Sequence, residues 1–179
     1  MIPSLLIASS CAICVAAFDY HDCGSKDAVV RFDDVSIQPE PLSFGDRAAV
    51  AATMRVREPV TEGKSRIEMY RLIHLFGAEI PVKVPCGWGS CTKDLCQDLG
   101  PGTIVCQWLK QSNVTCGCPL GPETIKSNDF TITVPKLNSI YSLFLNGMYR
   151  IRWTWTDALD REIGCVSADL EFGDTRKHK

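Results

Sequence analysis

The chain has 179 residues, of which 45% are hydrophobic, and its formal net charge at pH 7 is −2. A length of this order suits one domain with its own hydrophobic core. The nearly neutral charge argues against a nucleic-acid-binding surface, for which a basic balance is typical.

The first 17 residues are apolar, carry no charged side chain and end in the small residues Val15, Ala16 and Ala17. Such a run is typical of a secretory signal peptide, and it is shorter than the ~20 apolar residues of a membrane-spanning helix. We therefore predict a signal peptide over residues 1–17, a single domain over residues 18–173 and a flexible polar tail over residues 174–179. This organisation predicts a protein of the secretory pathway.

Alternation of apolar and polar side chains, which is typical of half-buried β-strands, recurs along most of the chain. We predict strands at 29–37, 48–57, 66–76, 80–84, 130–134, 148–156 and 165–172. Pro81 and Pro85 place the fourth of these at a sheet edge. About seven or eight strands separated by turn signals, with no long amphipathic helix, predict an all-β domain built as an antiparallel sandwich or barrel.

Six of the ten cysteines lie between residues 86 and 118, in a stretch that is rich in glycine and proline. Eight cysteines remain outside the predicted signal peptide, and an even number in a secreted chain indicates four disulfides, although the spacing alone does not define their pairing. A zinc cluster is the alternative, but the stretch has no C-x2-C pair and no histidine. We predict a disulfide-stapled loop or short-helix region over 86–118, with no metal and no cofactor.

The familiar catalytic motifs are absent from the sequence: it has no G-x-S-x-G elbow, H-E-x-x-H, P-loop or G-x-G-x-x-G. His74 lies on a predicted strand, where a surface histidine is the simpler interpretation than a catalytic base. Asp157, Asp160 and Glu162 cluster in a predicted turn; paired carboxylates serve glycoside hydrolysis, but turns are ordinarily acidic and solvated. The residues predict a protein that is not an enzyme, and a small secreted hydrolase is the least favoured alternative.

Several short motifs resemble those of one known family in the same order along the chain. They are Val84-Pro85-Cys86, Gly89-Ser90-Cys91-Thr92, Leu95-Cys96, Cys116-Gly117-Cys118-Pro119-Leu120, Phe130…Val134-Pro135, Gly147-Met148-Tyr149-Arg150-Ile151 and Ile163-Gly164-Cys165. Together they span most of Cys23 to Phe172 and resemble the ganglioside activator family, which belongs to the lipid-recognition (ML) domain proteins.

This resemblance implies a β-cup, in which two antiparallel sheets enclose an apolar pocket for lipid acyl chains. It implies a secreted or lysosomal protein that extracts a glycolipid or other lipid from a membrane and presents it to a hydrolase, with a lysosomal glycosidase as the candidate partner. It also implies the pairing Cys23–Cys165, Cys86–Cys91, Cys96–Cys118 and Cys106–Cys116. The alternative within the same fold is a recognition protein that binds sterol or microbial lipid for signalling or defence.

Candidate lipid-binding residues come from the inward strand faces and from the apolar run 140–145. Small inward residues such as Ala48 and Ala52 beside large ones leave room for an acyl chain, whose burial is worth about 0.8 kcal/mol per CH2. We interpret the run 140–145 as a cup-rim or membrane-dipping loop; the alternative is a core strand or short helix. The candidates are Met54, Met69, Ile73, Tyr141, Leu143, Phe144, Leu145, Trp153 and Trp155. The expected ligand is a glycolipid or phospholipid, taken up during transient contact with a membrane surface.

Two further sequence features concern the predicted surface. Four basic residues flank one predicted hairpin, where they either meet anionic lipid or form a solvated face; they are Arg55, Arg57, Lys64 and Arg66. Asn113-Val114-Thr115 is an N-glycosylation sequon between two cysteines, and we expect Asn113 to carry a glycan.

Overall fold

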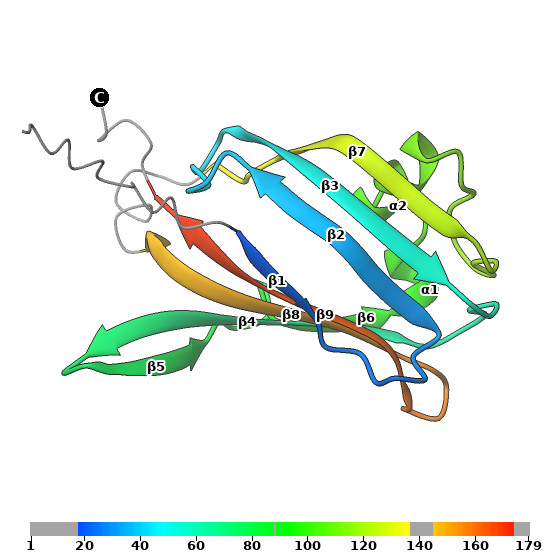
Figure 1. Ribbon diagram of the computed structural model, residues 1–179, viewed down its shortest axis with the longest axis horizontal. Coiled ribbons are helices and arrows are strands. Elements are labelled where there is room, and N and C mark those ends of the chain that lie inside the picture. The colour runs from blue at the N-terminus through cyan, green and yellow to red at the C-terminus, as the bar shows by residue number, and fades with distance from the viewer. Residues whose placement is uncertain (1–17, 88, 137–144, 174–179) are drawn as a thin grey trace, which may run out of the picture.

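The computed structural model describes residues 18–87, 89–136 and 145–173, which form two antiparallel β-sheets and two short helices (Figure 1). The all-β, two-sheet fold predicted from the alternation is confirmed. The predicted signal peptide and polar tail lie outside the described residues, as do Tyr141, Leu143 and Phe144.

The larger sheet has six strands, in the order β1-β9-β8-β4-β5, with β6 paired to the start of β4. Its strands are β1 (Asp19–Asp22), β4 (Lys64–Leu75), β5 (Ala78–Lys83), β6 (Cys91–Asp94), β8 (Gly147–Thr156) and β9 (Glu162–Phe172). The alternation on β8 is as predicted, because Tyr149 and Trp155 are buried while Arg150 and Arg152 are exposed. β5 ends the sheet, in agreement with the edge position predicted from its prolines.

The smaller sheet has three strands in the order β2-β3-β7. They are β2 (Val30–Gln38), β3 (Arg47–Val56) and β7 (Thr124–Thr133). β7 begins earlier than predicted. Its pairing shifts between Val50 and Ala52 on the neighbouring strand, and the buried positions of β7 pass there from Ser127 to Phe130. This irregularity breaks the strict two-residue period by which a strand is predicted.

The cysteine-rich stretch contains two short helices, α1 (Leu95–Asp98) and α2 (Ile104–Gln111). Each begins at a capping side chain, because Asp94 accepts a hydrogen bond from the backbone N–H of Gln97 and Thr103 accepts one from that of Cys106. The four disulfides are Cys23–Cys165, Cys86–Cys91, Cys96–Cys118 and Cys106–Cys116. These are the pairs that the family resemblance implies.

Apolar side chains fill the end of the sandwich that lies next to the turn between β8 and β9. This core consists of Val30, Phe32, Met54, Val56, Val60, Leu95, Leu99, Leu109, Leu120, Ile125, Trp155 and Ile163. Gly164 allows the sheets to approach closely here, since a Cβ at this position would lie 2.9 Å from the Cβ of Val30. A smaller core towards the other end contains Ile37, Leu42, Ala48, Val134 and Leu170. No helix among the described residues is long and apolar enough to cross a membrane.

Candidate functional site

An apolar cavity of about 260 Å³ lies between the two sheets, with α2 forming part of its wall. Its lining residues are Phe32, Val35, Val50, Ala52, Ile104, Val105, Trp108, Phe130, Ile132, Trp153 and Val166. None of these side chains is charged, and only the two tryptophans carry a polar group. A cavity of this composition suits a hydrocarbon chain, because a charged or strongly hydrated group would lose its water here without compensation.

The cavity wall combines residues at strand spacing with residues at helix spacing. Val50 and Ala52 are two residues apart on β3, and Phe130 and Ile132 are two residues apart on β7, so each pair points to one face of its strand. The wall residues of α2 lie at positions 104, 105 and 108, which share one side of a helix. Ala52 is the smallest of the lining side chains, and its size leaves space between its larger neighbours.

Trp153 is held in place on the cavity wall by a buried chain of hydrogen bonds. Its indole Nε1 donates to Ser65 Oγ at 2.8 Å, and Ser65 Oγ donates to Asp98 Oδ2 at 2.6 Å. Ser65 and Asp98 are both buried. The indole also packs against Trp155, with ring centroids 5.2 Å apart in a T-shaped arrangement. These contacts fix the orientation of the Trp153 ring on the cavity wall.

A second apolar cavity, of about 360 Å³, lies farther along the inner face of β8. Its lining residues are Phe44, Met69, Val84, Gly87, Pro135, Leu145, Tyr149 and Phe172. Tyr149 and Trp153 point to the same face of β8 with Ile151 between them, so the two cavities follow one another along the interior. Burial raises the pKa of Tyr149, and its hydroxyl donates to the carbonyl of Leu145 at 2.7 Å.

The structure places the predicted lipid-binding residues in different surroundings. Trp153 lines the first cavity, and Met69 and Leu145 line the second. Met54 and Trp155 are fully buried in the packed core and line neither cavity. They face inward as expected, but they lie at the filled end of the sandwich, and an inward position does not by itself distinguish a core residue from a cavity wall.

Ile73 is half-buried on β4, opposite Ile80 of β5, and lines neither cavity. Tyr141, Leu143 and Phe144 lie outside the described residues.

Sequence reasoning missed the contribution of α2 to the cavity wall. Ile104, Val105 and Trp108 lie in the predicted stapled loop or short-helix region, but the prediction does not include them among the lipid-binding residues, although their spacing is helical and Thr103 precedes them as a capping residue. Apolar residues at helical spacing directly after a capping threonine could have predicted this helix and its apolar side.

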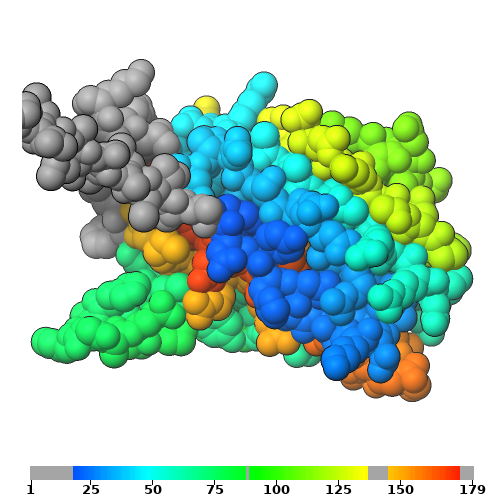
Figure 2. Space-filling model, in the orientation of Figure 1, coloured from blue at the N-terminus to red at the C-terminus, as the bar shows by residue number. Residues whose placement is uncertain are grey.

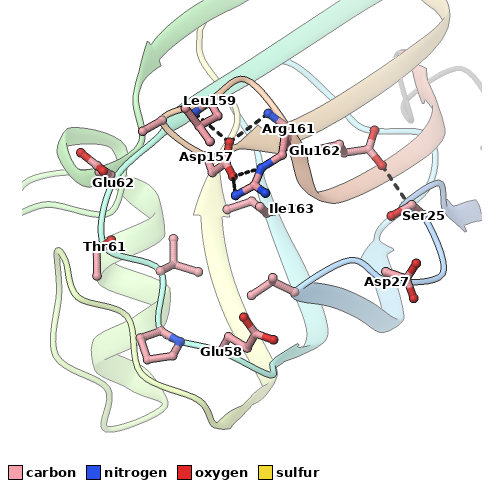
Figure 3. A pocket seen from close by; sticks show the side chains of 14 residues that line it. Ser25, Asp27, Glu58, Thr61, Glu62, Asp157, Leu159, Arg161, Glu162 and Ile163 are labelled. Atoms are coloured by element: carbon pink, nitrogen blue, oxygen red, sulfur yellow. Dashed lines mark hydrogen bonds and ion pairs between the residues drawn. The ribbon is translucent and has the colours of Figure 1, made fainter.

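The acidic turn between β8 and β9 borders a separate pocket with a mostly polar lining (Figure 3). Asp157 Oδ1 accepts hydrogen bonds from the backbone N–H groups of Leu159 and Arg161, and its Oδ2 accepts from Arg161 Nε at 2.7 Å. The backbone hydrogen bond from Arg161 is the largest cause of the lowered pKa of Asp157. Asp160 pairs with Lys64, and Glu162 accepts from the backbone N–H of Ser25. The acidic residues therefore have structural partners that organise the turn.

The prediction that the four basic residues flank one hairpin is wrong. β3 and β4 belong to different sheets, so the chain crosses the sandwich between Arg57 and Lys64. Arg55 pairs with Asp33 at 2.7 Å, and Lys64 pairs with Asp160 at 2.7 Å. These ion pairs account for two of the four charges.

Asn113 is exposed directly after α2, within the loop closed by Cys106–Cys116. Its surface position leaves the sequon accessible to a glycosylating enzyme.

Fold and cavities together define the class: an all-β sandwich of two antiparallel sheets with an apolar interior and a disulfide-linked helix on its wall. The family model of the ML domain matches residues 17–172, and the chain belongs to the ML domain family. The narrower assignment to the ganglioside activators stays a prediction.

The solved structures that this chain resembles include a Niemann-Pick type C2 protein from the Japanese carpenter ant. It is 21% identical with a TM-score of 0.48, over 87% of this chain and 100% of that one. Chicken MD-1, solved in complex with lipid IVa, is 14% identical with a TM-score of 0.40, over 86% of this chain and 97% of that one. Among curated proteins, none matches the chain.

Proposed function

We propose that this protein binds a lipid by taking an acyl chain into the apolar cavity between its sheets, and that it carries the lipid to or from a membrane. The observation that carries the proposal is the cavity itself, which is lined by eleven apolar residues and left unfilled by side chains. Membership of the lipid-recognition domain family supports it. The role is binding and transfer without catalysis.

The energetics favour this ligand. Each CH2 that moves from water into an apolar site contributes about 0.8 kcal/mol, so a chain leaves a bilayer readily only for a site that is equally apolar. The first cavity alone is slightly smaller than ordinary ligand pockets, which measure about 300–1,000 Å³. The second cavity extends the apolar space along the same face of β8, and a long chain that occupies both places its head group outside the sandwich.

The motif resemblance extends the proposal to a head group and a partner. We propose that the cargo is a glycolipid whose sugar stays outside the cavity, and that the protein presents this sugar to a lysosomal hydrolase. The four disulfides support an oxidising compartment, extracellular or lysosomal. We also propose that Asn113 carries a glycan.

Native mass spectrometry of the purified protein, followed by solvent extraction and lipid identification, tests the proposal. A stoichiometric lipid supports lipid carriage, and its head group separates a glycolipid from a sterol or a microbial lipid. A mass equal to that of the polypeptide and any glycan, without uptake of added glycolipid or phospholipid at neutral or acidic pH, contradicts it.

A further inference from the structure

A recess of about 320 Å³ lies beside the second cavity, and it is lined by residues of β4, β6, α1 and the segment before β6. Ile67 lines this recess, and Met69, the next residue on the same face of β4, lines the second cavity. These two positions are about 7 Å apart along the strand. Gly87 lines both spaces. The recess, here called the polar recess, is therefore a direct neighbour of the second cavity.

The segment before β6 is held against β4 by hydrogen bonds from one serine. Ser90 Oγ accepts from the backbone N–H of Met69 at 2.9 Å and donates to the carbonyl of Met69 at 3.2 Å. A Cβ at Gly89 would lie 2.8 Å from Met69 Sδ, whereas a Cβ at Gly87 would meet no atom within 4 Å. The segment thus contacts β4 closely at Gly89 and leaves open space at Gly87, where the recess and the cavity adjoin.

Asp98 of α1 brings a carboxylate to the polar recess. Only 10% of its side chain is exposed. Its Oδ2 accepts from Ser65 Oγ at 2.6 Å, and Ser65 Oγ in turn accepts from the indole N–H of Trp153. The other carboxylate oxygen, Oδ1, accepts no hydrogen bond from any group in residues 18–87, 89–136 and 145–173.

The one cation that pairs with Asp98 in the described part of the chain is Lys93, whose Nζ lies 4.0 Å from Oδ1. This separation is longer than a hydrogen bond. β6 places Lys93 directly opposite Ser65 in the strand register, but 61% of its side chain is exposed, so its charge is largely solvated. A nearly buried carboxylate is stable when a cation and hydrogen-bond donors compensate it fully. Asp98 lacks a close cation and a donor at Oδ1.

We propose that the polar recess binds the primary ammonium group of a single-chain amphiphile, and that the alkyl chain of this ligand enters the second cavity. An ammonium group carries a positive charge and three N–H donors, so it supplies both things that Asp98 Oδ1 lacks. The adjoining apolar cavity accepts the chain. This inference rests on the proposed uptake of a chain; it is independent of the proposed glycolipid head group and adds a second class of cargo.

Displacement of a fluorescent fatty acid at neutral pH tests the inference, with hexadecylamine, hexadecanol and hexadecanoic acid as competitors. The three share one chain, so the ratio of the amine affinity to the alcohol affinity isolates the head group and cancels any change in chain binding. We expect the amine to bind about tenfold more tightly than the alcohol, which is the gain typical of a hydrogen bond to a charged group. The acid should bind no more tightly than the alcohol.

Two substitutions should change this ratio in opposite directions. Asp98→Asn keeps an acceptor for Ser65 but removes the charge, so we expect the ratio to fall about tenfold. Lys93→Ala removes the competing cation, so we expect the ratio to rise about two- to fivefold. The matched control is Lys126→Ala, which removes an exposed lysine from β7 of the smaller sheet, the yellow strand at the upper right of Figures 1 and 2. We expect this control to leave the ratio unchanged.

Equal affinities of the wild type for the amine and the alcohol overturn the inference and leave the proposed function intact. A ratio that neither Asp98→Asn nor Lys93→Ala changes has the same meaning, because a purely structural Asp98 would affect all three ligands alike. If Asp98→Asn does not fold, a ratio for Lys93→Ala at or below that of the wild type overturns the inference. A wild type that binds none of the three ligands contradicts the proposed function and this inference with it.

Discussion

Trp153 shows how a single side chain serves both packing and site. Its ring lines the first cavity, while its indole N–H is committed to Ser65 and through it to the buried carboxylate of Asp98. Breaking a buried hydrogen bond costs more free energy than its formation contributes to stability, because the donor or carboxylate that loses its partner has no water to bind instead. The hydroxyl of Ser65 therefore links the cavity wall to α1.

Replacing this hydroxyl tests the link. We expect Ser65→Ala to lower the free energy of unfolding by about 1–3 kcal/mol, because two buried groups lose their partner. Trp153→Phe removes the donor at the other end, and a double-mutant cycle by urea denaturation measures their coupling. Additive effects of the two substitutions would show that Ser65 and Trp153 are not coupled through this hydrogen bond.

The contribution of Glu40 to the free energy of unfolding changes with pH in the opposite direction to that of an ion-paired carboxylate. Burial raises its pKa, and the nearby Glu171 raises it further, against a smaller lowering by a backbone hydrogen bond from Phe18. A raised pKa in the folded state means that the negative charge of Glu40 opposes folding once the pH lies above it, and that protonation relieves this opposition as the pH falls.

We therefore expect Glu40→Gln to stabilise the fold at neutral pH, by on the order of a few tenths of a kcal/mol because the group is partly solvated. Below the pKa of the unfolded chain, where Glu40 is protonated in both states, the variant and the wild type should unfold at the same temperature. Thermal unfolding from neutral to acidic pH measures the difference. A stabilisation that is independent of pH contradicts this account.

At the scale of elements, strict alternation made β3, β4, β8 and β9 predictable from the sequence. The elements whose presence or bounds could not be predicted are those defined by their partners. β1 has the polar sequence Asp19–Asp22 and exists through pairing with β9 beside the disulfide Cys23–Cys165. α2 has only eight residues, and short helices depend on tertiary contacts and caps more than on propensity.

The disulfide Cys106–Cys116 holds α2 at the cavity wall. It joins the buried first turn of the helix to the segment that follows it, at a sequence separation of 10. We expect the double change Cys106→Ala with Cys116→Ala to destabilise the fold by about 2–3 kcal/mol and to weaken fatty-acid binding, because α2 loses its anchor. Denaturation and fluorescent-ligand titration measure the two effects. An unchanged affinity for the fluorescent ligand in a folded variant would show that α2 does not form part of the binding site.

At the scale of the whole molecule, the sandwich is filled at one end and contains apolar cavities towards the other. The filled end lies next to the turn of β8 and β9, and the cavities run along β8 towards the end at which β4 pairs with β5. The sequence could not separate these ends, since Trp153 and Trp155 have the same period and the same chemistry. Their different roles arise from the residues that the opposite sheet and α2 place against them.

The most direct test of lipid carriage is to fill the cavity. Ala52→Phe places a ring in the first cavity, while Ala49→Phe places the same ring on the same strand at an exposed position. We expect titration with a fluorescent fatty acid to show at least a tenfold loss of affinity for Ala52→Phe, which corresponds to about 1.4 kcal/mol, and wild-type affinity for Ala49→Phe. Equal affinities for the wild type and a folded Ala52→Phe variant would contradict the assignment of this cavity as the lipid site.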